Sequence, residues 1–331
     1  MSFFPVSHSN LSAKYLGEYL QNNFDFHGKV KCSIVRSGIN DSYLVEDDRN
    51  RYIFRVYSLN WRSEEEIREE IRLLNLLKDN RISVSYPIPD FNKNYIHTFD
   101  APEGERFGVM FSYAEGEKLL NYSNELHYKA GKLMAQFHAV TNNLSIHRTT
   151  YNAEKLLITS FEQIGKFLSS QTDEWKYLKS LQQLLLQEFQ QIKRDQLRFG
   201  IVHLDIWSDN FNIDRNGVIT IFDFDFCGNG WLCLDIAYYT IQLYNMERYD
   251  VAIAGAKLGH FISGYESITT LTDEEKRILP MLGTALNFFY LGTQCYRFEN
   301  WSNSFLNEAH IKRYINGVVK RYHDIHRLSE E

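Results

Sequence analysis

The chain has 331 residues, of which 44% are hydrophobic and 15% aromatic, so it can bury a large core in two lobes or domains and is not disordered. Its net charge of −6 argues against a general nucleic-acid binder, because a phosphate backbone attracts a basic surface. The four cysteines form no Cys-x-x-Cys pair and no apolar run reaches about 18 residues, which argues against a disulfide framework, structural zinc and a membrane span.

The first hundred residues have the pattern of a helix followed by an antiparallel meander. Apolar residues recur at helical spacing over residues 11–24. Three short strand-like runs follow at residues 33–36, 43–45 and 52–57, joined by tight polar turns. Sequential strands with such short connections predict a small antiparallel sheet.

A second helix is expected to begin at Ser63. Ser63 and Glu66 have the spacing of a capping box, in which the hydroxyl and the carboxylate each satisfy an exposed backbone N–H. Two more strand-like runs, residues 95–99 and 107–113, would complete the sheet.

A boundary is expected at Glu115-Gly116-Glu117, beyond which the pattern is mostly helical. We predict an α+β, protein-kinase-like two-lobe architecture, with an N-lobe of residues 1–114 and a helical C-lobe of residues 115–331. The expected helices of the C-lobe are residues 124–141, 153–168, 175–197, 234–244, 251–265, 273–296 and 306–328.

The most informative segment is a His-x-Asp-x-x-x-x-Asn motif at residues 203–210, followed by an apolar strand, residues 218–222, that leads into Asp223. Phosphoryl transfer needs a base that orients a hydroxyl and oxygen ligands for Mg²⁺. The Asp205 carboxylate can act as the base, while the Asn210 amide and the Asp223 carboxylate are hard oxygen ligands. Each residue alone also fits an ordinary cap or turn, but the spacing of the set favours phosphoryl transfer.

Two further residues of this region have alternative interpretations. His203 is either a proton carrier or, as we favour, a buried hydrogen-bonded side chain that fixes the catalytic loop. Asp225 shares a face with Asp223 if strand geometry persists, which would make it a metal ligand or a neighbour of one. It is equally compatible with a solvated side chain.

The N-lobe supplies candidates for nucleotide binding. Arg55, a cation within an apolar strand, would contact the α/β-phosphates from a cleft, and Glu70 of the following helix would hold it. The alternatives are an outward-facing strand arginine and a solvated helix carboxylate. The turn with Gly38 and Asn40 would cover the phosphates, although a hairpin glycine is also expected without a ligand. Residues 111–114 are either a hinge that bonds the adenine edge or an inter-lobe linker.

These segments, in this order, resemble the aminoglycoside phosphotransferase superfamily, the small-molecule branch of the protein-kinase-like fold, which includes choline kinases and type II homoserine kinases. The resemblance covers about residues 30–240 and rests on the catalytic motif, residues 221–225, Leu234-Asp235-Ile236-Ala237, the strand of Arg55 and the hinge ending in residues 114–117. It implies that Asp205 is the catalytic base and that Asn210 and Asp223 bind Mg²⁺. It also implies that Arg55 and Glu70 form the phosphate-anchoring pair, that Ser112 and Ala114 are the hinge positions, and that Asp235 braces the catalytic loop.

Two positions depart from the family pattern. Leu204 stands where the family usually has Gly, and Arg55 stands where kinases usually have Lys. The sequence also lacks the Asp-Phe-Gly and Ala-Pro-Glu signatures of eukaryotic protein kinases, which favours a small-molecule acceptor.

The sequence therefore predicts a cytoplasmic enzyme that uses Mg²⁺ and ATP, or GTP, to phosphorylate a hydroxyl of a small, amine-bearing molecule. The residues expected near that acceptor are Trp207, Asp209, Tyr290 and Glu299, because aromatic faces and carboxylates suit an amine or quaternary ammonium. The alternative, which we favour for any single aromatic residue, is that it belongs to the core. Two alternatives stay open: a bacterial protein kinase of the same superfamily, and a non-catalytic nucleotide-binding module. No partner other than the acceptor follows from the sequence, and neither does an oligomeric state.

Overall fold

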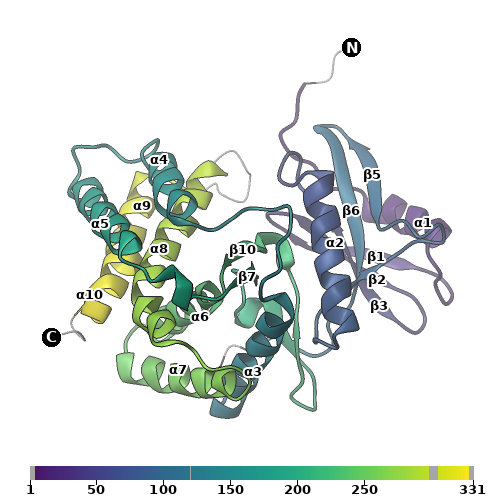
Figure 1. Cartoon of the computed structure of the whole chain (residues 1–331). Coiled ribbons are helices and arrows are strands. Elements are labelled where there is room, and N and C mark those ends of the chain that lie inside the picture. The colour runs from purple at the N-terminus through teal and green to yellow at the C-terminus, as the bar shows by residue number, and fades with distance from the viewer. Residues whose placement is uncertain (1–3, 120, 298–304, 328–331) are drawn as a thin grey trace. The chain divides into compact units, whose positions relative to one another are not determined.

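The computed structural model describes residues 4–119, 121–297 and 305–327 (Figure 1). Two compact units make up the chain. The first unit contains the residues up to Glu115 together with Thr220–Phe222, and the second contains Gly116–Ile219 and the described chain from Asp223 onward.

The first unit is built on an antiparallel sheet with the strand order β1-β2-β3-β6-β4, in which β5 also pairs with β6. The predicted meander is confirmed, and the turns between the first three strands lie where the sequence placed them. The strands are β1 (Lys31–Ser37), β2 (Asp41–Glu46), β3 (Arg51–Val56), β4 (Pro87–Ile88), β5 (Ile96–Ala101) and β6 (Gly104–Ser112).

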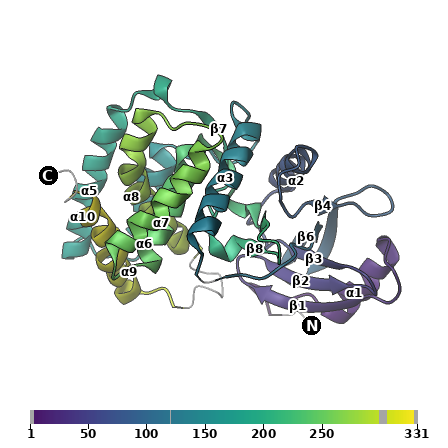
Figure 2. The same cartoon turned by 90° about the horizontal axis from the view of Figure 1, so that it is seen from below.

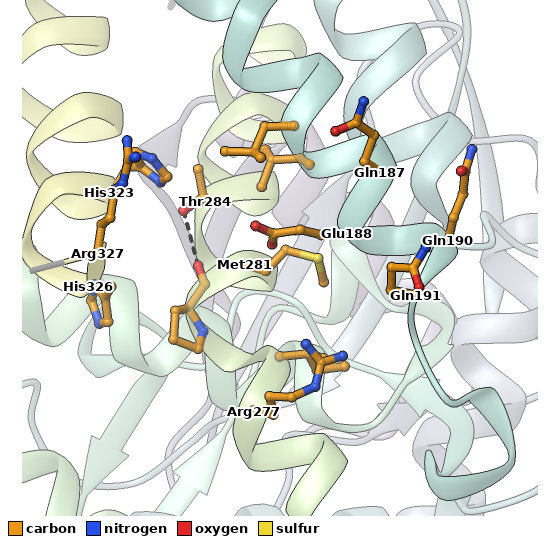
Figure 3. A pocket seen from close by; sticks show the side chains of 14 residues that line it. Gln187, Glu188, Gln190, Gln191, Arg277, Met281, Thr284, His323, His326 and Arg327 are labelled. Atoms are coloured by element: carbon orange, nitrogen blue, oxygen red, sulfur yellow. Dashed lines mark hydrogen bonds between the residues drawn. The ribbon is translucent and has the colours of Figure 1, made fainter. Parts of the chain in front are cut away.

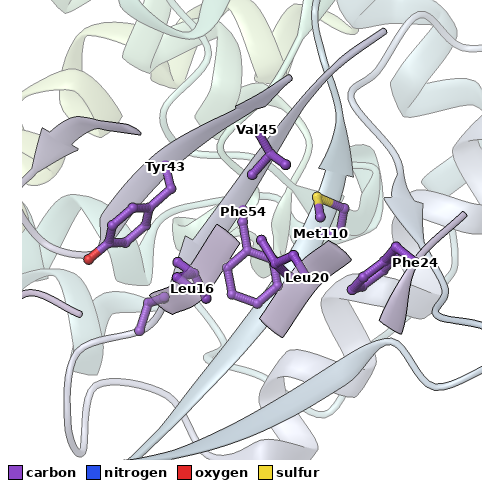
Figure 4. Packing of buried hydrophobic residues seen from close by; sticks show 8 residues of the cluster. Leu16, Leu20, Phe24, Tyr43, Val45, Phe54 and Met110 are labelled. Atoms are coloured by element: carbon purple, nitrogen blue, oxygen red, sulfur yellow. The ribbon is translucent and has the colours of Figure 1, made fainter. Parts of the chain in front are cut away.

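Two helices cover opposite faces of this sheet. The helix α1 (Ala13–Asn23) buries Leu16 and Leu20 against Phe54 of β3 and Met110 of β6 (Figure 4). The helix α2 (Glu64–Asp79) begins with the capping box of Ser63, as expected, and lies toward the side chain of Arg55. Because successive side chains of a strand point to opposite faces, Phe54 and Arg55 direct the two helices to the two sides of β3.

The second unit is mainly helical, as predicted, and contains two segments of π-helix, η1 and η6. Its longer described helical elements are α3 (Asn124–Thr141), η1 (Glu154–Thr159), α4 (Ser160–Ile164), α5 (Asp173–Gln190), α6 (Cys233–Met246), α7 (Val251–Glu266), α8 (Asp273–Tyr296), α9 (Glu308–Tyr314), η6 (Ile315–Lys320) and α10 (Arg321–Arg327). The continuous helix expected over residues 306–328 is therefore interrupted by η6 between α9 and α10.

Short strands frame the catalytic motif. The strand β7 (Phe199–Val202) leads into the motif and pairs antiparallel with β10 (Gly228–Trp231), while β8 (Phe211–Ile213) and β9 (Ile219–Ile221) flank the turn that follows it. The sequence did not predict β10, because Gly228-Asn-Gly-Trp has low strand propensity. Gly228 is required there by close packing, since a Cβ atom would overlap the main-chain carbonyl of Thr149.

The helices α3 and α7 pack side by side, and two glycines set their closest approach (Figure 1 and Figure 2). A Cβ atom on Gly131 of α3 would overlap the main-chain carbonyl of Phe261, and one on Gly264 of α7 would overlap that of Tyr128. Gly259, also on α7, has open space around its Cβ position.

We expect Gly131→Ala to destabilise the protein by about 1–3 kcal/mol, because the new methyl group forces two packed backbones apart. Gly259→Ala is the matched control, and we expect it to stabilise by about 0.4–1 kcal/mol through the lower entropy of the unfolded chain. Urea unfolding monitored by circular dichroism measures both changes. Equal unfolding midpoints for the two variants would contradict this account of the α3–α7 contact.

Candidate active site

The catalytic motif forms a tight loop in the second unit, between β7 and the short 3-10 helix η3 (Ser208–Asn210). The Asn210 Nδ2 donates to the Asp205 carboxylate at 2.7 Å and to the Asp205 main-chain oxygen at 2.8 Å. Asn210 is only 2% exposed, whereas Asp205 is half-buried. Because the donor end of the Asn210 amide is used by Asp205, its carbonyl oxygen is the end that suits a metal.

A buried carboxylate on α6 holds the start of this loop. Asp235 is fully buried and accepts hydrogen bonds from the backbone N–H groups of His203, at 2.9 Å, and Leu204, at 2.6 Å. The His138 Nε2 lies 3.0 Å from the same carboxylate, and the His138 Nδ1 lies 2.8 Å from the Tyr265 hydroxyl. Asp235 therefore sits at the centre of a buried polar network.

Leu204 has a left-handed backbone, with φ of 57°, and its side chain is fully buried. This conformation lets two successive N–H groups reach one carboxylate. It also gives a physical reason for the glycine that the family usually has here, since glycine adopts positive φ without strain. Leucine in place of glycine at position 204 thus affects the backbone conformation as well as the packing.

His203 has the surroundings expected of a side chain that fixes the loop. It is fully buried, its Nδ1 accepts from the Asp205 N–H at 3.0 Å, and its ring meets Phe224 edge-on with centroids 4.4 Å apart. An imidazole that accepts at Nδ1 from its own loop is positioned to orient Asp205. These contacts favour the loop-fixing interpretation of His203 over proton transfer.

Two tyrosines also lie close to Asp205. The Tyr238 hydroxyl donates to the Asp205 carboxylate at 2.5 Å, and the Tyr290 hydroxyl donates to the main-chain oxygen of Leu204. Their rings lie 5.2 Å apart. Burial, followed by the charge of Asp205, raises the pKa of both phenols well above the usual value, so both remain hydrogen-bond donors. The sequence singled out Tyr290 but missed Tyr238, which stands three residues after Asp235 on the same helix.

The strand before Asp223 does not continue through it. β9 ends at Ile221, Asp223 has a left-handed φ of 64°, and the 3-10 helix η4 (Phe224–Phe226) follows. Strand geometry therefore does not persist from Asp223 to Asp225, and the two side chains do not share a strand face. Asp225 is 3% exposed, so it is not solvated.

Arg148, which the sequence did not single out, holds the turn after Asp223. Its guanidinium donates to the main-chain oxygens of Asp225, at 2.5 Å, and Phe224, at 3.1 Å, and lies 3.9 Å from the Asp225 carboxylate. The Tyr151 hydroxyl donates a hydrogen bond of 2.6 Å to the main-chain oxygen of Phe226. This clamp is invisible to a motif search because residues 148–151 lie far from the turn in sequence.

The first unit contains the predicted Arg55–Glu70 pair. Arg55 Nη1 lies 3.1 Å from Glu70 Oε1, and the Tyr57 hydroxyl donates to Glu70 Oε2 at 3.2 Å. Arg55 is 8% exposed and Glu70 is 1% exposed. The alternatives of an outward-facing arginine and a solvated carboxylate are therefore wrong.

The other candidates of the first unit are engaged in its own structure. The Asn40 side-chain oxygen accepts from the Ser58 N–H at 3.2 Å, and the Gly38 N–H donates to the Asn40 main-chain oxygen at 3.2 Å. The Ser112 N–H donates to Tyr86 and the Ser112 oxygen accepts from the Ser85 hydroxyl. Ala114 is buried. A backbone contact of Ser112 with adenine would have to use the second lone pair of its carbonyl oxygen.

The remaining acceptor candidates differ in position. Trp207 is half-buried, Asp209 is exposed, and Glu299 lies outside the described residues. A hollow of about 730 Å³ is lined by residues of α5, α8 and α10, and none of them is a predicted site residue. Figure 3 shows these lining side chains. Volume alone therefore does not locate the candidate site.

The donor set fits Mg²⁺ bound together with phosphates. Within residues 4–119, 121–297 and 305–327, His, Cys, Asp and Glu side chains form no group of three or more that could hold a metal. Mg²⁺ commonly takes one or two protein ligands and fills its remaining positions with phosphate oxygens and water. Two such protein ligands are present here: the carbonyl oxygen of Asn210 and the carboxylate of the half-buried Asp223.

Of the helices that the structure describes, none is both long and apolar enough to cross a membrane.

The sheet, the helical unit and the braced Asp205 loop define a kinase-like phosphotransferase. The model of the phosphotransferase enzyme family that contains the aminoglycoside phosphotransferases matches residues 31–269, and the chain belongs to this family. The resemblance noted from the sequence is thus confirmed, and so are the α+β fold class and the assignment as an enzyme that phosphorylates an alcohol group.

Individual proteins extend this likeness over most of the chain. An uncharacterized protein of Synechocystis is 30% identical over 84% of this chain and 77% of its own length. The structure of a microcompartment-associated aminopropanol kinase has a TM-score of 0.74 at 18% identity, covering 93% of this chain and 95% of that one. The structure of an amicoumacin kinase in complex with AMP-PNP, Ca²⁺ and amicoumacin has a TM-score of 0.74 at 19% identity. The match covers 96% of this chain and 97% of that one.

We expect Asp235→Asn to lower the free energy of unfolding by about 1–3 kcal/mol, because the amide turns an N–H toward buried donors. Asp250→Asn is the matched control: Asp250 caps α7, and asparagine caps a helix equally well. Thermal and urea unfolding of both variants measure the difference. A variant at Asp235 as stable as the one at Asp250 would show that the buried network does not depend on this carboxylate.

Proposed function

We propose that the chain transfers the γ-phosphate of Mg²⁺-bound ATP, or GTP, to a hydroxyl of a small amine-bearing molecule. The observation that carries this proposal is the Asp205–Asn210 unit, in which the amide donor is bonded to the carboxylate and its carbonyl end is left for a metal. The nucleotide-analogue complex of the structurally similar amicoumacin kinase supports a nucleotide as the donor.

In this reaction the acceptor O–H donates to the Asp205 carboxylate. The acceptor oxygen attacks the γ-phosphorus, the bond to the leaving diphosphate oxygen breaks, and the proton ends on Asp205. Tyr238 and Asn210 each donate to one oxygen of the carboxylate, which holds it in a fixed orientation for the acceptor. Mg²⁺ held by Asn210 and Asp223 would neutralise charge on the phosphates.

The tyrosines around Asp205 support an amine on the acceptor. Tyr238 and Tyr290 lie with ring centroids 5.2 Å apart, and Tyr314 is close enough to raise the pKa of both. A cation is attracted to the faces of such rings and to the neighbouring carboxylate. An amino alcohol therefore suits this environment better than a neutral alcohol, in keeping with the likeness to an aminopropanol kinase.

A direct test is a phosphorylation screen of the full chain with radiolabelled ATP and Mg²⁺. The acceptors are amino alcohols, homoserine, choline, thioribose sugars and aminoglycosides, with a mixed protein substrate alongside. Transfer to one or more amine-bearing small molecules is the expected result. Transfer to protein alone would replace this proposal with the protein-kinase alternative, and nucleotide binding without any transfer would favour the non-catalytic module.

We expect Asp205→Asn to lower kcat by about 10²–10⁴-fold, since the base is lost while nucleotide binding is kept. Tyr238→Phe removes one hydrogen bond to a charged group, worth about 1.5–3 kcal/mol, and should lower kcat by about 10–100-fold. Asp173→Asn, an exposed carboxylate of α5, is the control. Steady-state kinetics that gave all three variants the same kcat would remove Asp205 from the proposed mechanism.

We expect Glu70→Gln to weaken nucleotide binding by about tenfold, because Arg55 loses the charge that holds it, and one such charged interaction is worth about 1.5–3 kcal/mol. The matched control is Glu69→Gln on the same helix, which contacts the exposed Arg72 instead. Isothermal titration with ATP and Mg²⁺, without acceptor, measures the affinity. If both variants bound nucleotide equally well, Arg55 and Glu70 would have a structural role only.

A further inference from the structure

A small cavity lies beside the catalytic loop. It has a volume of about 20 Å³ and is lined by residues that include Tyr122, His127 of α3, and Trp207 and Ser208 of the catalytic motif. Trp207 comes two residues after Asp205, so the cavity wall and the proposed base belong to one loop. A space of about 10–15 Å³ is enough for one water-sized group.

Two buried polar atoms of this lining have no hydrogen-bond partner in the described structure: the Tyr122 hydroxyl and the His127 Nε2. Tyr122 is 7% exposed and His127 is 3% exposed. An unsatisfied buried polar atom costs about 1–3 kcal/mol, so two beside one cavity call for a common partner. A water-sized oxygen in the cavity would serve both.

The protonation of the two residues makes both of them donors. Burial, followed by Lys257 and His260, lowers the pKa of His127 to about 4, so its ring is neutral near pH 7. The His127 Nδ1 lies 2.9 Å from the Tyr239 hydroxyl, and a phenol that donates there leaves the proton on Nε2. Burial and the charge of Asp209 raise the pKa of Tyr122, so its hydroxyl keeps its proton.

The charges around the cavity favour a neutral occupant. Lys257 lines it but forms an ion pair with Glu247, and the nearby Asp209 adds a negative charge. A carboxylate would meet this excess of negative charge. An ammonium group has no lone pair with which to accept from the Tyr122 and His127 donors.

We propose that this cavity is a second acceptor subsite, which takes one neutral oxygen, a hydroxyl or a carbonyl, of the molecule that Asp205 phosphorylates. This inference rests on the proposed function and narrows it: the acceptor carries an amine, the hydroxyl that receives phosphate, and a further neutral oxygen. Tyr122 and His127 are then residues that determine specificity, and they take no part in the transfer itself.

The test compares acceptors that differ by one oxygen. The short pair is 1-amino-2-propanol and 3-amino-1,2-propanediol, and the longer pair is 4-aminocyclohexanol and 4-aminocyclohexane-1,2-diol. The dissociation constant of each is measured by isothermal titration with the full chain, and phosphorylation is measured in parallel. The variant is Tyr122→Phe, which keeps the ring that stacks on Phe211. The control is Tyr128→Phe, a partly exposed tyrosine of α3.

In at least one pair we expect the oxygen-richer molecule to bind the wild type about 3–10-fold more tightly. Tyr122→Phe should abolish that preference and Tyr128→Phe should keep it. A preference that survives in Tyr122→Phe, or no preference in either pair, overturns the subsite. If the preference behaves as expected but no acceptor is phosphorylated, the fault lies with the proposed transfer reaction, so the two failures are distinguishable.

A crystal structure of the complex with the preferred acceptor provides a second measurement. The added oxygen should lie within hydrogen-bond distance of both the Tyr122 hydroxyl and the His127 Nε2. A water molecule in that position, with the acceptor bound elsewhere, would overturn the proposal.

Discussion

The geometry of the candidate site depends on the buried carboxylate of Asp235. An ionised group without water is costly, and Asp235 is tolerated because backbone N–H groups and His138 surround it. The same bonds fix the direction in which the chain leaves β7, and therefore where Asp205 points. Core stability and the orientation of the proposed base are thus consequences of one polar cluster.

The segments on either side of the turn at Asp214–Gly217 are held by different means. Before the turn, the loop of Asp205 is held by side chains of α6 and α8, including Tyr238 and Tyr290. After it, the chain beyond Asp223 is held by Arg148, which donates to main-chain oxygens of the turn and to the Cys227 sulfur and lies near the Asp225 carboxylate. One guanidinium thus recognises both the backbone and the side chains of the segment that follows Asp223.

The sequence predicted the parts of the fold that depend on local pattern. Helical periodicity located α3, α7 and α8, and motif spacing placed Asp205 and Asn210 in one loop, where their side chains are hydrogen-bonded. Tyr238, Arg148 and His127 could not be found in this way, because their importance comes from contacts between segments distant in sequence. The glycine-rich β10 was missed for the same reason: tertiary packing against residues near Thr149 outweighs its poor strand propensity.

Leu204 has a consequence for how this loop can change. Its backbone favours glycine, whereas its fully buried side chain fills space that glycine would leave empty. β-branched residues satisfy the second demand but are strongly disfavoured at positive φ. Leucine at position 204 therefore has an unfavourable backbone conformation, whereas glycine would leave a cavity. A substitution to glycine would have to be accompanied by a larger neighbouring side chain that fills this cavity. Such paired replacement would appear as covariation between residue 204 and the side chains packed against it.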